Sequence, residues 1–137
     1  MIWLLSVAGV VGCLGVLLRR RLLLVTVEGV SMEPTYRPGD RLLVRRTGLA
    51  GVRRGAAVVF AAPPGTDLRF MVKRAAALPG DPVPAGIPVA DTVVPAGHLV
   101  ILGDNSARSA DSRTMGFLPA GDVVGVVVRH SGFVPPP

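Results

Sequence analysis

Cysteine is almost absent from this chain of 137 residues. Cys13 is the only one, so neither an internal disulfide nor a cysteine-based zinc site can form. Aromatic residues make up only 4% of the chain and its arginines are dispersed, which argues against the stacking surfaces that nucleic-acid-binding proteins use. We therefore expect no redox chemistry, no metal, no cofactor and no nucleic-acid partner.

Lysine is as rare as cysteine. Of the 15 basic residues only Lys73 is a lysine, and the remainder are arginine. An arginine side chain cannot be deprotonated in a protein, whereas a desolvated lysine can lose its proton near neutral pH. Lys73 is therefore a candidate general base, although one lysine can also survive by chance in an arginine-biased sequence.

Glycine and proline, by contrast, are abundant, with 17 and 13 residues. They are too many for a helical bundle, and the 50% apolar content is too high for a disordered chain. The length suits one mostly β domain, a compact antiparallel barrel or sandwich rich in turns. Short valine-rich runs predict strands at Leu22–Val27, Arg41–Arg45, Ala57–Ala61, Arg69–Ala77, His98–Leu102 and Val123–Arg129.

The ends of the chain and one long connection do not follow this strand pattern. Residues 81–95 predict a loop with at most a short strand pair, and the tail 131–137 is expected to be irregular. Ile2 to Leu18 carry no charge and would span about 26 Å as a helix, which predicts a single transmembrane anchor over residues 1–18. Residues 19–137 would then form the domain.

A cleaved signal peptide is the alternative for the apolar run. It fits less well, because no basic residue precedes the run and Arg19, Arg20 and Arg21 stand where a small-residue cleavage site is needed. The same three arginines favour a cytoplasmic domain by the positive-inside rule. The side of the membrane on which the domain lies therefore stays open at this point.

Ser31 lies after the first predicted strand, in a turn close to Gly29, where a backbone or substrate can approach. A nucleophilic serine needs a base, and neither His98 nor His130 is well placed in the sequence to supply one. Strand alternation puts Lys73 on the same face as Met71 and Ala75, so its amine faces apolar neighbours. Desolvation lowers the pKa of a lysine, which suits a base acting on serine.

A third polar segment, residues 103–113, follows the strand predicted at His98–Leu102. Its residues Asp111 and Arg113 are two positions apart and can pair with each other. A calcium loop is the alternative, but acidic ligands are too few and the closing glutamate of an EF-hand is missing.

Together these segments resemble the successive motifs of the type I signal peptidase family of Ser/Lys proteases, in the order found in that family. The motifs are Ser31-Met32-Glu33-Pro34-Thr35, Arg37-Pro38-Gly39-Asp40, Lys73-Arg74, Pro79-Gly80-Asp81, Gly103-Asp104-Asn105 and Ser109-Ala110-Asp111-Ser112-Arg113. They cover residues 29–113. Only residues 81–102 separate the last two groups, so the chain resembles a minimal catalytic core, as in mitochondrial inner-membrane peptidases and small actinobacterial members.

The resemblance implies a role for each matching residue and a β core like that of signal peptidases and LexA-like proteins. Ser31 would be the nucleophile, with its own N–H as one oxyanion donor, and Lys73 would be the general base. Ser109 would orient the lysine amine. Two salt bridges, Arg74 with Asp104 and Asp111 with Arg113, would stabilise the scaffold. Gly29 replaces a serine of the Gram-negative members, so a backbone N–H near it would be the second oxyanion donor.

The function implied is a membrane-bound endopeptidase that removes signal or leader peptides from preproteins after small residues, on the extracytoplasmic face of the plasma membrane. The alternative is a maturation protease dedicated to one substrate, such as nickel superoxide dismutase, on the cytoplasmic side that the three arginines favour. A self-cleaving regulator fits less well, because only one helix and one strand precede Ser31. An inactive anchored β module is the non-enzymatic alternative.

Overall fold

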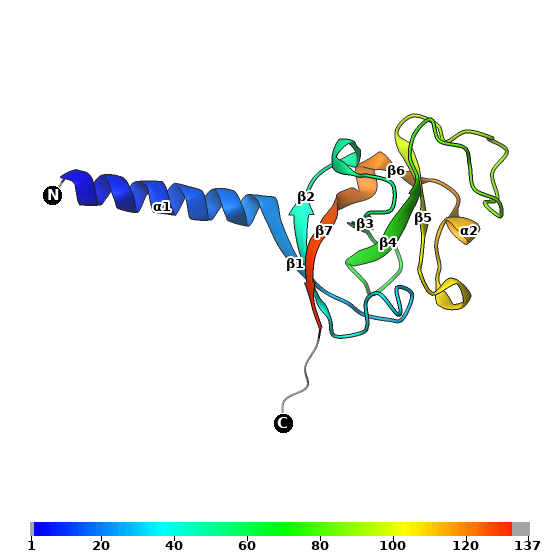
Figure 1. Ribbon diagram of the computed structural model, residues 1–137, viewed down its shortest axis with the longest axis horizontal. Coiled ribbons are helices and arrows are strands. Elements are labelled where there is room, and N and C mark those ends of the chain that lie inside the picture. The colour runs from blue at the N-terminus through cyan, green and yellow to red at the C-terminus, as the bar shows by residue number, and fades with distance from the viewer. Residues whose placement is uncertain (1, 133–137) are drawn as a thin grey trace, which may run out of the picture.

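The computed structural model describes residues 2–132. Helix α1 (Ile2–Arg21) leads directly into an all-antiparallel sheet (Figure 1). The strands are β1 (Leu22–Thr26), β2 (Arg41–Arg46), β3 (Ala57–Ala61), β4 (Phe70–Ala77), β5 (His98–Leu102), β6 (Leu118–Pro119) and β7 (Val123–Ser131). A short helix α2 (Ser112–Met115) lies between β5 and β6, and 3-10 turns occur at Leu49–Gly51, Ser106–Arg108 and Ala120–Asp122.

The strand order across the sheet is β1-β2-β7-β3-β4-β5-β6. The C-terminal strand β7 is thus inserted between β2 and β3, which joins the N-terminal hairpin to the rest of the sheet. Register shifts occur in the β2–β7, β3–β7 and β4–β5 pairs, and such irregularities bend a sheet. The seven-stranded sheet is therefore curved at these three strand pairs.

Alternation along the central strands distributes side chains between two apolar clusters. In β3, Val58 and Phe60 belong to one cluster while Ala57 and Val59 belong to the other, and all four are buried. Ala77 joins a third, smaller cluster beneath the long connection between β4 and β5. The core therefore lies on both faces of the middle of the sheet, which makes β4 a rigid support for any side chain that it carries.

The six predicted strands are confirmed to within two residues at each end, and the predicted loop 81–95 contains a single bridge between Pro82 and Val93. Two short elements, β6 and α2, were not predicted. The irregular tail predicted at 131–137 is wrong at its first residue, because Ser131 pairs with Arg41 at the end of β7. Positions 133–137 lie outside the described residues.

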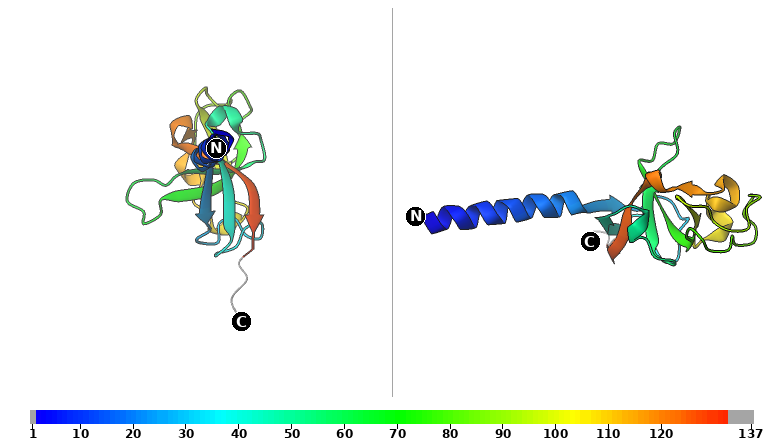
Figure 2. Two further views of the ribbon diagram at one scale, coloured as in Figure 1. Left: turned by 90° about the vertical axis from the view of Figure 1, so that its left-hand side faces the viewer. Right: turned by 90° about the horizontal axis from the view of Figure 1, so that it is seen from above.

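Helix α1 continues through Arg21, three residues beyond the boundary predicted for the apolar segment, and projects from the β1–β2 side of the domain (Figure 2). Within the described part of the chain, no helix meets the requirements of length and apolarity for crossing a membrane. The predicted transmembrane anchor is therefore not confirmed.

Candidate active site

Ser31 lies in the loop that joins β1 to β2, at the turn predicted for it. The base of this loop is closed by backbone hydrogen bonds from Val27 N–H to Asp40 C=O, at 2.8 Å, and from Gly39 N–H to Val27 C=O, at 2.9 Å. Two side chains of the loop, Met32 and Tyr36, are buried in the same apolar cluster as β2. The hydroxyl of Ser31 is thus carried by a packed loop whose position is fixed on both sides.

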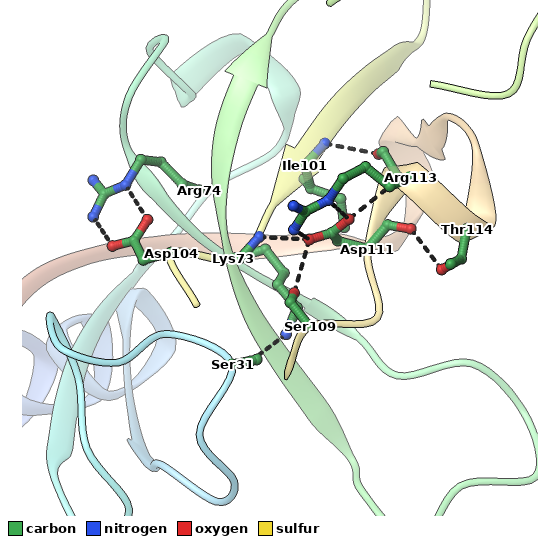
Figure 3. Close-up of polar contacts among 11 residues, drawn as sticks. Ser31, Lys73, Arg74, Ile101, Asp104, Ser109, Asp111, Arg113 and Thr114 are labelled. Atoms are coloured by element: carbon green, nitrogen blue, oxygen red, sulfur yellow. Dashed lines mark hydrogen bonds and ion pairs between the residues drawn. The ribbon is translucent and has the colours of Figure 1, made fainter. Parts of the chain in front are cut away.

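Lys73 lies in the middle of β4 and is only 3% exposed. Its neighbours Met71 and Ala75 pack in one apolar cluster while Val72 packs in the other, which agrees with the predicted alternation. The Nζ atom of Lys73 donates a hydrogen bond to Ser31 Oγ at 2.6 Å (Figure 3). Burial lowers the pKa of the Lys73 amine, and the negative charge of Asp111 opposes that shift without cancelling it.

Asp111 organises the polar segment that follows β5. Its completely buried carboxylate accepts hydrogen bonds from Gly103 N–H at 2.8 Å, from Ser109 Oγ at 2.8 Å and from both the backbone and the side chain of Arg113 (Figure 3). Burial alone would raise the pKa of Asp111, but these hydrogen bonds outweigh it and hold the pKa well below its usual range. The carboxylate therefore stays ionised and fixes the segment beside Lys73.

A second ion pair joins this segment to β4. Arg74 donates to both carboxylate oxygens of Asp104, at 2.8 and 2.6 Å, and to the carbonyl of Gly55 at 2.8 Å. Thr35 Oγ1, from the loop of Ser31, also donates to Asp104, at 2.5 Å. Asp104 thus connects the loop that carries Ser31, residues 27–40 (the Ser31 loop), to the strand that carries Lys73.

The structure brings together Ser31, Lys73 and both predicted ion pairs. The hydroxyl of Ser109 donates to Asp111, so its predicted role toward the lysine amine stays a prediction. Gly29 lies beside the site with a φ of 78°, a conformation that favours glycine. The two histidines have other partners: His98 Nδ1 lies 2.9 Å from Ala96 O, and His130 Nε2 lies 3.4 Å from Asp40 Oδ2.

A groove of about 540 Å³ opens at Ser31 and Lys73. One wall is the continuation of β1 toward Ser31, and the other is the first half of β4 with the residues before it. The lining residues are Leu24, Val25, Thr26, Val27, Glu28, Gly29, Val30, Ser31, Met32, Tyr36, Asp67, Leu68, Arg69, Phe70, Met71, Val72, Lys73, Arg108 and Ala110. Because the groove follows two strands, its shape suits an extended peptide.

Two further residues contact the Ser31 loop and had no role in the sequence-based prediction. Asn105 donates two hydrogen bonds to this loop, and Gly103 packs against the carbonyl of Ser31. Both belong to the polar segment. The one local sign of a close contact was Gly103 itself, a glycine directly after the apolar strand β5. Their partner lies more than 70 positions away in the sequence, so the contact could not be read from spacing.

Comparison with known proteins shows the family of the chain. Residues 1–86 and 84–130 match the profile of the family described as "Signal peptidase, peptidase S26". The chain is 33% identical to mitochondrial inner membrane protease subunit 1 of mouse and of human over 107 residues, which is 74% of this chain and 64% of each relative. It is 29% identical to signal peptidase IB of Staphylococcus aureus over 143 residues, covering 74% of this chain and 73% of that protein.

The fold and the site thus define a domain built on one antiparallel sheet, with a buried lysine in contact with a serine hydroxyl. The chain belongs to the signal peptidase family, peptidase S26. This confirms the resemblance on which the residue roles were predicted.

Proposed function

We propose that this protein is a serine endopeptidase that removes signal or leader peptides from preproteins, with Ser31 as nucleophile and Lys73 as general base. The observation that carries the proposal is the 2.6 Å contact between Ser31 Oγ and the buried Nζ of Lys73. Burial lowers the pKa of the Lys73 amine from its ordinary value, which is the direction that a lysine base requires.

The proposed reaction assigns a group to each step. Neutral Lys73 accepts the hydroxyl proton as Ser31 Oγ attacks the scissile carbonyl, and the resulting oxyanion is held by the N–H of Ser31 and by a backbone N–H near Gly29. Collapse of the tetrahedral intermediate breaks the peptide bond, and the Lys73 ammonium gives its proton to the leaving amine. Lys73 then takes a proton from water, which attacks the carbonyl of the acyl-enzyme. Collapse of this second tetrahedral intermediate breaks the ester bond, the Lys73 ammonium returns its proton to Ser31 Oγ, and the leader peptide leaves with a new carboxylate.

The remaining predicted residues would support this pair. Ser109 is proposed to orient the lysine amine while its hydroxyl is held by Asp111. The ion pair of Arg74 with Asp104 would hold the polar segment against β4, and the pair of Asp111 with Arg113 would hold the conformation of the segment itself. A lysine side chain has four rotatable bonds, so this support is what keeps its amine at the serine.

We expect cleavage to depend on pH through Lys73. A base is active in its neutral form, and the pKa of Lys73 lies below its ordinary value, so kcat/KM should rise with pH and level off below the range in which a free lysine titrates. The measurement is the pH profile of kcat/KM for a soluble peptide with alanine one and three positions before the cut. A profile that is flat from acidic to alkaline pH would contradict a lysine base, and the His98→Gln variant, which leaves the pair intact, should keep the wild-type profile.

We further propose that α1 holds the domain at a lipid bilayer, where the cleavage site of a preprotein emerges. Its support is the large exposure of apolar side chains along the helix, listed here: Val7, Val10, Val11, Leu14, Val16, Leu17 and Leu18. The domain would face the extracytoplasmic side, and small side chains would be required one and three positions before the cut, because alternate residues of a bound strand face the enzyme.

Deletion of residues 1–18 should therefore slow cleavage of a membrane-bound preprotein far more than cleavage of the soluble alanine peptide. The helix would raise the effective concentration of enzyme and substrate on the same surface, a gain of about 10²-fold or more. Both rates are measured with the full chain and the truncated chain under identical conditions. Equal effects on both substrates would favour the alternative, a maturation protease for one soluble substrate. Arg19, Arg20 and Arg21 are consistent with that alternative, because a basic cluster after the helix favours a cytoplasmic domain.

A further inference from the structure

Asn105 holds the two carbonyl groups that flank the nucleophile. Its backbone N–H donates to the carbonyl of Ser31 at 2.9 Å, and its side-chain Nδ2 donates to the carbonyl of Val30 at 3.1 Å. One residue of the polar segment therefore fixes the peptide unit on each side of Ser31.

The contact with Val30 also determines where the N–H of Ser31 points. The C=O of Val30 and the N–H of Ser31 belong to the same planar trans peptide, so the two bonds point in opposite directions. The carbonyl is held twice, by Asn105 Nδ2 and by Glu33 N–H at 3.1 Å. The N–H of Ser31 consequently points away from the Asn105 side chain, and within residues 2–132 it donates to no protein acceptor.

Asn105 is itself fixed relative to the base. Its carbonyl accepts the N–H of Arg108 at 3.0 Å, and the preceding residue, Asp104, is ion-paired with Arg74 on β4, directly after Lys73. The orientation of the Val30–Ser31 peptide is thus coupled to the strand that carries the amine. Hydrogen bonding to a peptide carbonyl also polarises that peptide and makes its N–H a stronger donor.

We propose that Asn105 is a positioning residue that aims the N–H of Ser31 at the oxyanion of the tetrahedral intermediate. This inference rests on the proposed serine-protease function and adds a residue to it. An oxyanion donor contributes only when it is oriented before the charge develops, and a peptide unit held at one carbonyl has that orientation in advance.

The test compares Asn105→Asp and Asn105→Ala with a matched control, Thr35→Val. An aspartate has the same shape but its carboxylate cannot donate to the Val30 carbonyl, and alanine removes the donor outright. Thr35→Val also removes one hydrogen bond between the same two loops, the one to Asp104, without touching the peptide of Ser31. All variants keep the backbone hydrogen bond of residue 105, so the comparison isolates the side chain.

Both Asn105 variants should lose about 10-fold to 100-fold in kcat with KM within about twofold, since the complete loss of an oxyanion donor costs about 10²-fold to 10³-fold. A peptide aldehyde provides the second readout. Ser31 Oγ bonds to the aldehyde carbon while its proton passes to Lys73 Nζ, and the carbonyl electron pair moves to the aldehyde oxygen, which occupies the oxyanion position. Aldehyde binding should weaken by the same factor as kcat, whereas binding of the cleaved product peptide should not change.

Equal losses of kcat in the Asn105 variants and in Thr35→Val would overturn the inference, as would equal weakening of aldehyde and product binding. Thermal unfolding of each variant identifies a misfolded protein, and Asn105→Asp, the isosteric change, is then decisive over Asn105→Ala. Failure of the wild-type chain to bind the aldehyde would instead overturn the proposed function. A wild type that binds it, together with an Asn105→Asp variant that binds it equally well, would overturn the inference alone.

Discussion

Lys73→Arg is expected to lower kcat for the alanine peptide by about 10⁴-fold or more, the size of loss seen when one member of a catalytic unit is removed. Arginine retains the positive charge but cannot be deprotonated, so it cannot take the proton of Ser31. Ser31→Ala should have an equal effect, and the double variant should be no worse than either single one, because the two groups act in one proton transfer. Single-turnover assays of the three variants measure this.

Lys73→Met serves as the second variant of this position, because a larger guanidinium in a buried site can disturb packing. Methionine fills the same apolar surroundings, carries no charge and cannot accept a proton. The far-ultraviolet circular dichroism and the unfolding midpoint of Lys73→Met should resemble those of the wild type while turnover is lost. Turnover by Lys73→Met within tenfold of the wild-type rate would exclude a lysine base.

The parts of this site that could be predicted from the sequence depend on residues that are close together in the chain or on motifs in a known order. The face of β4 that carries Lys73 follows from alternation between neighbouring residues, and the structure confirms it. The ion pair of Arg74 with Asp104 came from resemblance to a family, the pair of Asp111 with Arg113 came also from their spacing of two positions, and both are present. Each of these predictions needed only residue order, either within one strand or along a known series of motifs.

The parts that could not be predicted depend on long-range packing. The insertion of β7 between β2 and β3 has no local signature, because the apolar pattern of a strand does not specify its neighbours. The two-residue strand β6 and the four-residue helix α2 are too short for a periodic signal. Asp111 caps helix α2 by accepting the backbone N–H of Arg113 at its first turn, and hydrogen bonds from Gly103 and Ser109 hold its carboxylate in that position.

Gly103→Ala is the second substitution with a large expected effect. A Cβ at this position would lie 2.5 Å from the Cβ of Ser109 and 2.7 Å from the carbonyl oxygen of Ser31, closer than side-chain atoms approach one another. Overpacking of this kind costs about 1 to 3 kcal/mol. The neighbours cannot yield freely, because Ser109 is bonded to Asp111 and the carbonyl of Ser31 accepts the N–H of Asn105.

The clash should therefore displace the Ser31 loop, residues 27–40, from the polar segment. We expect kcat to fall by about 10²-fold, as for a reactive group misplaced by about 1 Å. Gly121→Ala is the matched control, because its Cβ would meet nothing within 4 Å and its φ does not require glycine. Urea unfolding and peptide cleavage are measured for both variants. If Gly103→Ala lost stability but retained the wild-type kcat, the loop of Ser31 would be held by contacts other than those of Gly103 and Asn105, and the coupling between the two loops would not control the reaction.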